Sequence, residues 1–256
     1  MPTNNNKGKR QRAVKLNPAI VKAYAKAKGI TSFKNFEYEL FKFLELKEVE
    51  GQTNNIAEKA WKGQPMDKNR AKKIADFLGL NEDFSRLQIP TEPEWVKLLA
   101  NYCDKSKNFM NFLCHKNKLE LIDFGLINQN ELKSVKVNYP WQVKLSGQQD
   151  EKIFLLLRSW NKFFLVAPLN IDCEFNNQFN GKTLLYPQRS INFNKHDGIG
   201  YRELIAIKAK SIPFMPRHPD EGFAVELNDL ERFAHQVLED NDKKVEVARY
   251  SFVLVP

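Results

Sequence analysis

Cysteine is scarce in this sequence, with three residues in 256, namely Cys103, Cys114 and Cys173. Because their number is odd and none lies in a C-x-x-C pair, the sequence indicates neither a disulfide framework nor a structural zinc site. No apolar run approaches the ~20 residues that a helix needs to cross a bilayer, so we expect no membrane partner. The first segment, MPTNNNKGKRQR, has no apolar stretch behind its charges, which argues against a secretory signal and for a cytoplasmic location.

Catalytic signatures are absent as well. His196, His218 and His235 lie far apart in the sequence, and no serine or cysteine occupies a G-x-S-x-G turn. The sequence holds no glycine-rich phosphate loop and no close pair of metal ligands. The pair Cys114-His115 would need further ligands that the sequence does not reveal. We therefore predict that the protein is not an enzyme and uses neither a cofactor nor a metal ion.

Positive charge, by contrast, is plentiful and unevenly placed. The net charge is +9, from 40 basic and 31 acidic residues. Residues 1–88 hold 18 bases and 10 acids, whereas residues 89–256 hold 22 bases and 21 acids. Nearly all of the excess therefore belongs to the first third of the chain. This asymmetry indicates an anionic partner that contacts the N-terminal part.

The hydrophobic patterns predict an α+β fold in four segments. Residues 1–16 show no hydrophobic period, and residues 17–88 have the spacing of helices. Residues 89–134 are expected to form a linker and a helical connector, because Ile89-Pro-Thr-Glu-Pro-Glu carries two prolines between helical patterns. Residues 135–256 are rich in β formers and predict a β-rich domain.

The first segment is predicted to be a flexible basic arm. It contains Lys7, Lys9, Arg10, Arg12 and Lys15 and no acidic residue. An isolated tail of this kind serves solubility as readily as binding. Next to a DNA-binding domain, however, such arms commonly add phosphate or minor-groove contacts.

Four helices with glycine-marked turns are predicted in the second segment. The first begins with Asn17 and Pro18, an N-cap followed by a proline in the first turn. Each later helix is preceded by a serine, threonine or aspartate, and each ends near a glycine, which favours the left-handed backbone at a helix end. The predicted boundaries are Asn17 to Gly29, Ser32 to Gly51, Thr53 to Gly63 and Asp67 to Gly79.

The remaining segments change character along the chain. A helix is predicted from Trp95 to Tyr102, and the run Phe109 to Leu113 is expected to continue helical structure. From Val135 onward the sequence predicts strands, interrupted by one helix over residues 229–238. The strand-like runs are VKVNYPWQVKL, IFLLLRSW, KFFLVAPL, TLLYP, ELIAIKAK and VEVARYSFVLV.

The stretch NNIAEKAWKGQPMDKNRAKKIADFLGL, residues 54–80, resembles the helix-turn-helix domain of the lambda-repressor-like, or XRE, family. Trp61-Lys62-Gly63 matches the aromatic-basic-glycine end of the family's recognition helix. The next helix matches the family pattern A-x-x-I-A-x-x-L-G with Ala71, Ile74, Ala75, Leu78 and Gly79. The resemblance implies a non-enzymatic transcriptional regulator that binds double-stranded DNA. Proteins of this kind often bind as dimers on two-fold sites, so a homodimer is an expectation.

The physical demands on a recognition helix agree with this resemblance. Such a helix shows short polar donors and cations to the groove while its other face packs on a neighbouring helix. Ala57, Ala60 and Trp61 are expected to face inward. Asparagine pairs with adenine edges, lysine with guanine or phosphate, and glutamate with a cytosine amino group, although Glu58 is as readily a solvated helix charge. The predicted DNA-binding residues are Thr53, Asn54, Asn55, Glu58, Lys59, Lys62, Lys68, Arg70 and Lys72, with Lys7, Lys9, Arg10 and Arg12 of the arm.

One feature departs from the family. The second helix is predicted to be about twice the usual length, and it carries Glu37, Glu39, Glu45, Glu48 and Glu50. These acids would repel phosphate unless they point away from it. The alternative reading is therefore a helix-turn-helix scaffold that binds protein, as a non-enzymatic adaptor in a bacterial defence or signalling complex.

The C-terminal segment resembles an uncharacterised bacterial family of β-rich domains found in signalling and defence proteins. The matching features are IFLLLRSW, GKTLLYPQ, GYRELIAIKAKSIP, a helix near residues 227–238 and the closing strand VARYSFVLV. The resemblance implies a compact β-sandwich-like domain without established catalysis. We expect it to sense a signal or to bind a protein partner, and the loop beginning at Phe214 is a candidate contact.

Overall fold

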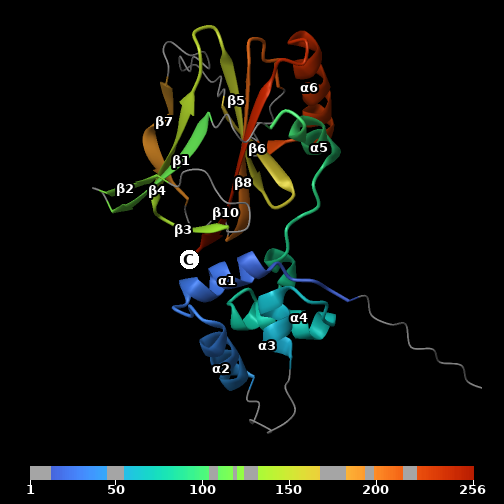
Figure 1. Ribbon diagram of the computed structural model, residues 1–256, viewed down its shortest axis with the longest axis vertical. Helices are drawn as coiled ribbons and strands as arrows, with labels where there is room; N and C mark the ends of the chain where they lie inside the picture. Colours follow the sequence, from blue (N-terminus) through green and yellow to red (C-terminus); the bar gives the residue numbers. More distant parts are fainter. Residues whose placement is uncertain are drawn as a thin grey trace, which may run out of the picture. The chain divides into compact units, whose positions relative to one another are not determined.

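The computed structural model contains helices and sheets, as the expected α+β class requires (Figure 1). The chain divides into two compact units, residues 1–89 and 90–256. Each unit is described by itself below. The structure describes residues 13–44, 55–103, 109–117, 120–123, 132–167, 183–193, 199–215 and 224–256.

The first unit is built from short helices, and three N-caps confirm the sequence prediction, whereas the predicted start of the third helix at Thr53 is wrong because that helix begins at Ile56. The Asn17 side chain accepts hydrogen bonds from the backbone N–H groups of Ala19 and Ile20. Ser32 and Asp67 cap the second and fourth helices in the same way. Because caps satisfy backbone donors locally, they define where a helix begins. The helices are α1 (Pro18–Ala27), α2 (Phe33–Phe43), α3 (Ile56–Lys62), α4 (Lys68–Phe77) and the 3-10 turn η1 (Phe84–Leu87).

The predicted length of the second helix is wrong. Helix α2 ends at Phe43 with Leu44 as its C-cap, instead of continuing to Gly51. The buried residues of α2 are Phe36 and Leu40, and the Phe36 ring packs on Phe77 at a ring-centroid distance of 5.5 Å. Phe43, which is 47% exposed, contacts the same ring at 5.6 Å. Glu45, Glu48 and Glu50 lie outside the described residues. Glu37 and Glu39 are therefore the predicted acids that α2 itself carries.

The second unit contains two sheets. The smaller one has the strand order β2-β1-β4-β7 and the larger one the order β3-β10-β8-β5-β6-β9. Two helices, α5 (Glu94–Ala100) and α6 (Leu227–Asp240), confirm the helices predicted in this part. The strands are β1 (Met110–Asn117), β2 (Glu120–Asp123), β3 (Lys133–Lys136), β4 (Pro140–Ser146), β5 (Lys152–Ser159), β6 (Lys162–Ala167), β7 (Thr183–Asn192), β8 (Gly200–Ala209), β9 (Ala224–Val225) and β10 (Glu246–Val255).

The helical connector predicted to reach residue 134 is wrong beyond α5. Residues 110–117 form strand β1, which pairs antiparallel with β4 in the register Met110 to Leu145 and Cys114 to Trp141. Alternate residues Met110, Phe112 and Cys114 are buried in one hydrophobic cluster, which is the period of a strand. Pairing with β4 therefore overrides the local helical pattern.

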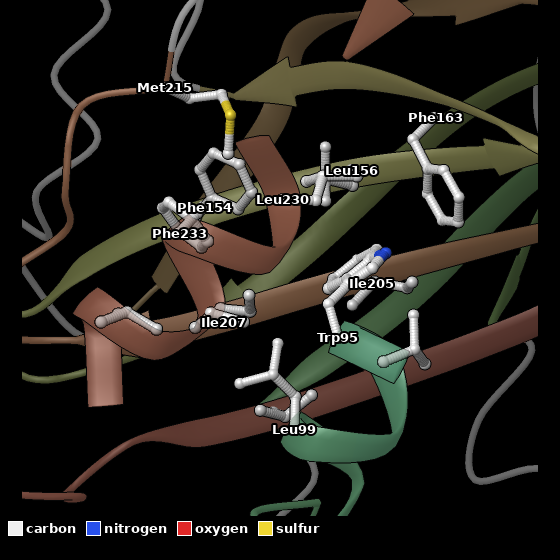
Figure 2. Packing of buried hydrophobic residues seen from close by; sticks show 14 of the residues in the cluster. Trp95, Leu99, Phe154, Leu156, Phe163, Ile205, Ile207, Met215, Leu230 and Phe233 are labelled. Carbon is white, nitrogen blue, oxygen red and sulfur yellow. The ribbon is translucent and has the colours of Figure 1, made fainter. Parts of the chain in front are cut away.

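The larger sheet is buried on both faces. One cluster joins it to the smaller sheet, where the rings of Phe112 in β1 and Phe252 in β10 stack at 5.1 Å. The other cluster joins it to α5 and α6 through Trp95, Phe154 and Phe233 (Figure 2). Strand β8 lies between these two cores, and all ten of its residues are buried. This explains why ELIAIKA is a nearly continuous apolar run instead of an alternating one.

Candidate nucleic-acid interface

Helix α3 is the centre of the candidate interface in the first unit. It contacts α1, α2 and α4, and its residues Ile56, Ala57 and Ala60 are buried. The inward orientation predicted for Ala57 and Ala60 is confirmed. Trp61 is half-buried, because its ring lies against Phe36 at 5.0 Å on one side. Packing on three neighbouring helices holds one face of α3 and leaves the opposite face to solvent.

The solvent face of α3 is a polar stripe. Asn55, Glu58, Lys59 and Lys62 follow one another at the spacing i, i+3, i+4, i+7, which places them on one side of the helix. Lys62 Nζ lies 2.6 Å from Glu58 Oε1, and the two side chains are 59% and 42% exposed. Such an exposed pair is worth about 0.3–0.5 kcal/mol, so Lys62 exchanges this carboxylate for another anion at little cost. Among the described residues, no carboxylate forms an ion pair with Lys59.

The cations predicted on α4 differ in their environment. Arg70 Nε lies 3.1 Å from the carboxylate of the capping residue Asp67. Lys72 Nζ lies 3.2 Å from Glu82, and both side chains are largely exposed. Lys68 is exposed in the first turn of α4, with no ion pair to any described residue. All three cations are accessible, and two of them are held in place by local carboxylates.

Six predicted contacts lie outside the described residues. They are the arm residues Lys7, Lys9, Arg10 and Arg12, together with Thr53 and Asn54, which precede α3. Helix α3 itself begins at Ile56, with Asn55 in the N-cap position.

Sequence reasoning missed how the chain before α1 is attached. Val14 N–H donates to the Met66 carbonyl at 2.7 Å, and Met66 N–H donates to the Val14 carbonyl at 2.9 Å. Residue 13 therefore lies next to the turn between α3 and α4. A two-residue bridge between positions 52 apart carries no sequence signal. Sequence reasoning also missed Lys22, whose Nζ sits 5.4 Å from the centre of the Trp61 ring.

Gly63 closes α3 in a conformation that requires glycine. Its φ is +68°, in the left-handed region, and it is the C-cap of α3. A Cβ atom at this position would lie 2.7 Å from Pro18 Cγ and 2.9 Å from Pro18 Cδ. The glycine of the Trp61-Lys62-Gly63 sequence therefore lets α3 end directly against the start of α1.

We expect Gly63→Ala to destabilise the first unit by about 2–4 kcal/mol, because it adds the left-handed backbone cost to an overpacked contact with Pro18. Native-state hydrogen exchange of the α1 and α3 amides measures this loss. Gly29→Ala is the matched control, since Gly29 has φ +81° and no atom within 4 Å of the added Cβ. It should cost only about 1–2 kcal/mol. Equal losses for the two variants would contradict the close approach of Pro18.

The second unit holds a buried ionic cluster that sequence reasoning did not find. Glu203 of β8 is 1% exposed, and its carboxylate lies 3.3 Å from Arg158 NH1 of β5 and 2.6 Å from Arg249 NH2 of β10. Burial opposes the charge of Arg249, but the carboxylates of Glu203 and Glu92 outweigh it and raise the pKa of this guanidinium. Burial, followed by the charge of Glu203, raises the pKa of Tyr201 to about 12. At neutral pH Arg249 is therefore charged and Tyr201 is a neutral phenol.

The second unit also presents a shallow cavity and some exposed side chains to solvent. A shallow cavity of about 350 Å³ between α5 and α6 is lined by Trp95, Leu98, Glu231 and His235, among others. His235 is exposed, whereas His196 and His218 lie outside the described residues. Phe214 is 78% exposed at the start of the predicted contact loop. Within the described ranges, no three histidine, cysteine or acidic side chains gather closely enough to hold a metal ion.

Comparison with protein-family models, curated proteins and solved structures finds no match to this chain. None of the described helices combines the length and the apolar character needed to cross a bilayer.

Proposed function

We propose that this protein is a sequence-specific DNA-binding regulator of transcription, with a helix-turn-helix domain of the lambda-repressor-like type in residues 17–88. The observation that carries the proposal is the polar stripe of α3, which is presented by a helix whose opposite face is buried against three others. In the proposed complex α3 lies in the major groove. Asn55 then faces base edges, Lys59 and Lys62 meet guanine or phosphate, and Lys68, Arg70 and Lys72 face phosphates.

The charge of the described first unit supports a polyanionic ligand. Residues 13–44 and 55–89 hold 13 basic and 7 acidic residues. One of these cations is structural, since Lys28 Nζ donates to the Phe77 carbonyl at 2.6 Å and so closes the C-terminal end of α4. The cations of α3 and α4 are all exposed or half-exposed. The shorter α2 also keeps fewer acids on the helix than the sequence predicts.

We propose that the second unit, as a β-sandwich-like domain, senses a signal or binds a protein partner. Exposed Phe214 supports a partner contact, because a large apolar side chain at this exposure is costly in water. The regulator would act as a homodimer on a two-fold site. Its location would be the cytoplasm, where DNA is accessible.

The second candidate function is an adaptor that uses the helical unit for protein contacts. It is favoured by Tyr38 and Phe43 of α2, which are 63% and 47% exposed. Recovery of a stoichiometric protein partner through this face, together with no duplex binding at low salt, would favour the adaptor.

Selection of bound duplexes from a random library tests the DNA proposal directly. The affinity of the selected duplexes is then measured over a range of salt concentrations. We expect Lys59→Ala with Lys62→Ala to weaken binding at least about tenfold and to reduce the salt slope by about 2 if both lysines meet phosphate. Without these lysines, the counterions that they would displace from the phosphates are no longer released on binding.

The matched control is Lys42→Ala with Lys210→Ala, which removes the same charge from exposed positions outside α3 and α4. It should change affinity much less than the α3 variant. Unchanged binding by the α3 double variant would remove α3 from the interface, and enrichment of a palindrome by the whole protein would support the homodimer.

A further inference from the structure

The chain is anchored on both sides of Ile89, at the boundary between the two units. On the N-terminal side, Asn17 N–H donates to the Leu87 carbonyl at 2.7 Å. Gln88 Nε2 donates to the Lys15 carbonyl at 3.0 Å. The backbone of residue 87 and the side chain of residue 88 are thus fastened within the first unit.

On the C-terminal side, the anchor is the buried ionic cluster of the larger sheet. Arg158 NH2 donates to the Thr91 carbonyl at 2.7 Å and to the Pro90 carbonyl at 3.4 Å. The next residue, Glu92, forms an ion pair with Arg249 NH1 at 2.5 Å. Residues 90–92 are therefore fastened within the second unit.

The sheet holds the anchoring side chains on one face. Arg158 and Glu203 are direct cross-strand partners, and Arg249 lies on the diagonal from Glu203, whose direct partner in β10 is Ser251. Glu203 binds both guanidinium groups and so fixes the orientation of the two arginines that contact residues 90–92. Bidentate and charge-assisted contacts of this kind are directional, and arginine remains charged at any physiological pH.

We propose that the Arg158–Glu203–Arg249 cluster is a clamp that confines the hinge between the two units to Ile89. Units joined by an ordinary linker move independently by default. Here the flexible part is a single residue, and Pro90 restricts that residue further because the proline ring clashes with the backbone of the residue before it. The proposal does not depend on what the first unit binds.

Backbone ¹⁵N order parameters of the full-length protein test this clamp. In the unaltered protein we expect values of about 0.85 at Thr91 and Glu92 and a minimum at Ile89. Arg158→Lys combined with Glu92→Ala removes the guanidinium contacts to the carbonyls and the pair with Arg249. We expect it to lower the order parameters at positions 91 and 92 below about 0.6.

Glu94→Ala is the matched control, because Glu94 belongs to the same segment and its carboxylate pairs with Lys97 at 2.6 Å on the surface. It should leave the order parameters at 91 and 92 unchanged. If the double variant fails to fold, Glu92→Ala alone serves, since Glu92 is partly exposed and its loss leaves the Arg158 contacts intact. We then expect the order parameter to fall at position 92 while position 91 stays rigid. Values below about 0.6 at 91 and 92 in the unaltered protein, or a rigid value at position 92 in a folded variant, would overturn the clamp.

Discussion

Glu203→Ala is expected to lower the free energy of unfolding of the second unit by about 3–5 kcal/mol, because it leaves buried arginine charge without a counterion. Arg158 is 2% exposed, and Glu203 is the carboxylate with which it forms an ion pair among the described residues. Water cannot replace the lost carboxylate without opening the face of the sheet that Arg158 lies on. The carbonyl contacts of Arg158 remain in the variant, but they do not neutralise its charge.

The unpaired charge of Arg249 is expected to lower the stability of the same variant by less than that of Arg158 does. It keeps its ion pair with Glu92 and is partly exposed, so solvent screens part of its charge. Most of the loss should therefore come from Arg158. This predicts that a second change, Arg158→Leu, recovers part of the stability lost in Glu203→Ala, because it removes the uncompensated charge.

Native-state hydrogen exchange at the amides of β5 and β8 measures the effect, since these central strands open only when the unit unfolds. Glu94→Ala is the control, and loss of its exposed pair with Lys97 should cost no more than about 1 kcal/mol. A loss of similar size for Glu203→Ala would show that Arg158 is neutralised in another way.

Phe252→Ala should destabilise the second unit by about 3–5 kcal/mol, because it opens a cavity between the two sheets. Phe252 is fully buried. The centre of its ring lies 5.1 Å from that of Phe112 and 5.7 Å from that of Phe193. These rings come from different sheets. The surrounding strands are tied by hydrogen bonds and cannot collapse fully into the space that the ring leaves.

Guanidinium unfolding followed by tryptophan fluorescence is suited to this test, since Trp95, Trp141 and Trp160 belong to the second unit. Phe214→Ala is the matched control, because that ring is largely exposed and its removal should stay within about 0.5 kcal/mol. Comparable effects for the two variants would mean that Phe252 does not join the sheets.

The sequence alone predicted the elements that depend on local contacts. Asn17, Ser32 and Asp67 mark helix starts because each bonds to an N–H group two or three residues ahead. The strand β8 was equally clear, since an apolar run of β formers persists wherever both faces of a sheet are buried. The inward face of α3 followed from the spacing of Ala57 and Ala60.

The failures occur where distant partners decide the local structure. Phe109 to Leu113 has a helical pattern, yet Met110 and Phe112 form a strand because β4 supplies hydrogen-bond partners about 30 residues away. The end of α2 is another case, since the extent of its packing on α4, through Phe77, was invisible in the sequence. The α3 residues proposed to contact bases follow from the chemistry of their side chains, whereas the ion pair between Glu58 and Lys62 was found only in the structure.

By itself, the sequence determined the α+β class, the helix starts at Asn17, Ser32 and Asp67, most of the strand-forming runs and the concentration of positive charge near the N-terminus. Only the tertiary structure decided that Arg158, Glu203 and Arg249 meet, because strand register brings together residues 45 and 46 positions apart. It likewise decided that Val14 lies beside Met66 and that Gly63 has no room for a side chain. Local propensity depends on a few neighbouring residues, whereas these contacts depend on how whole elements pack.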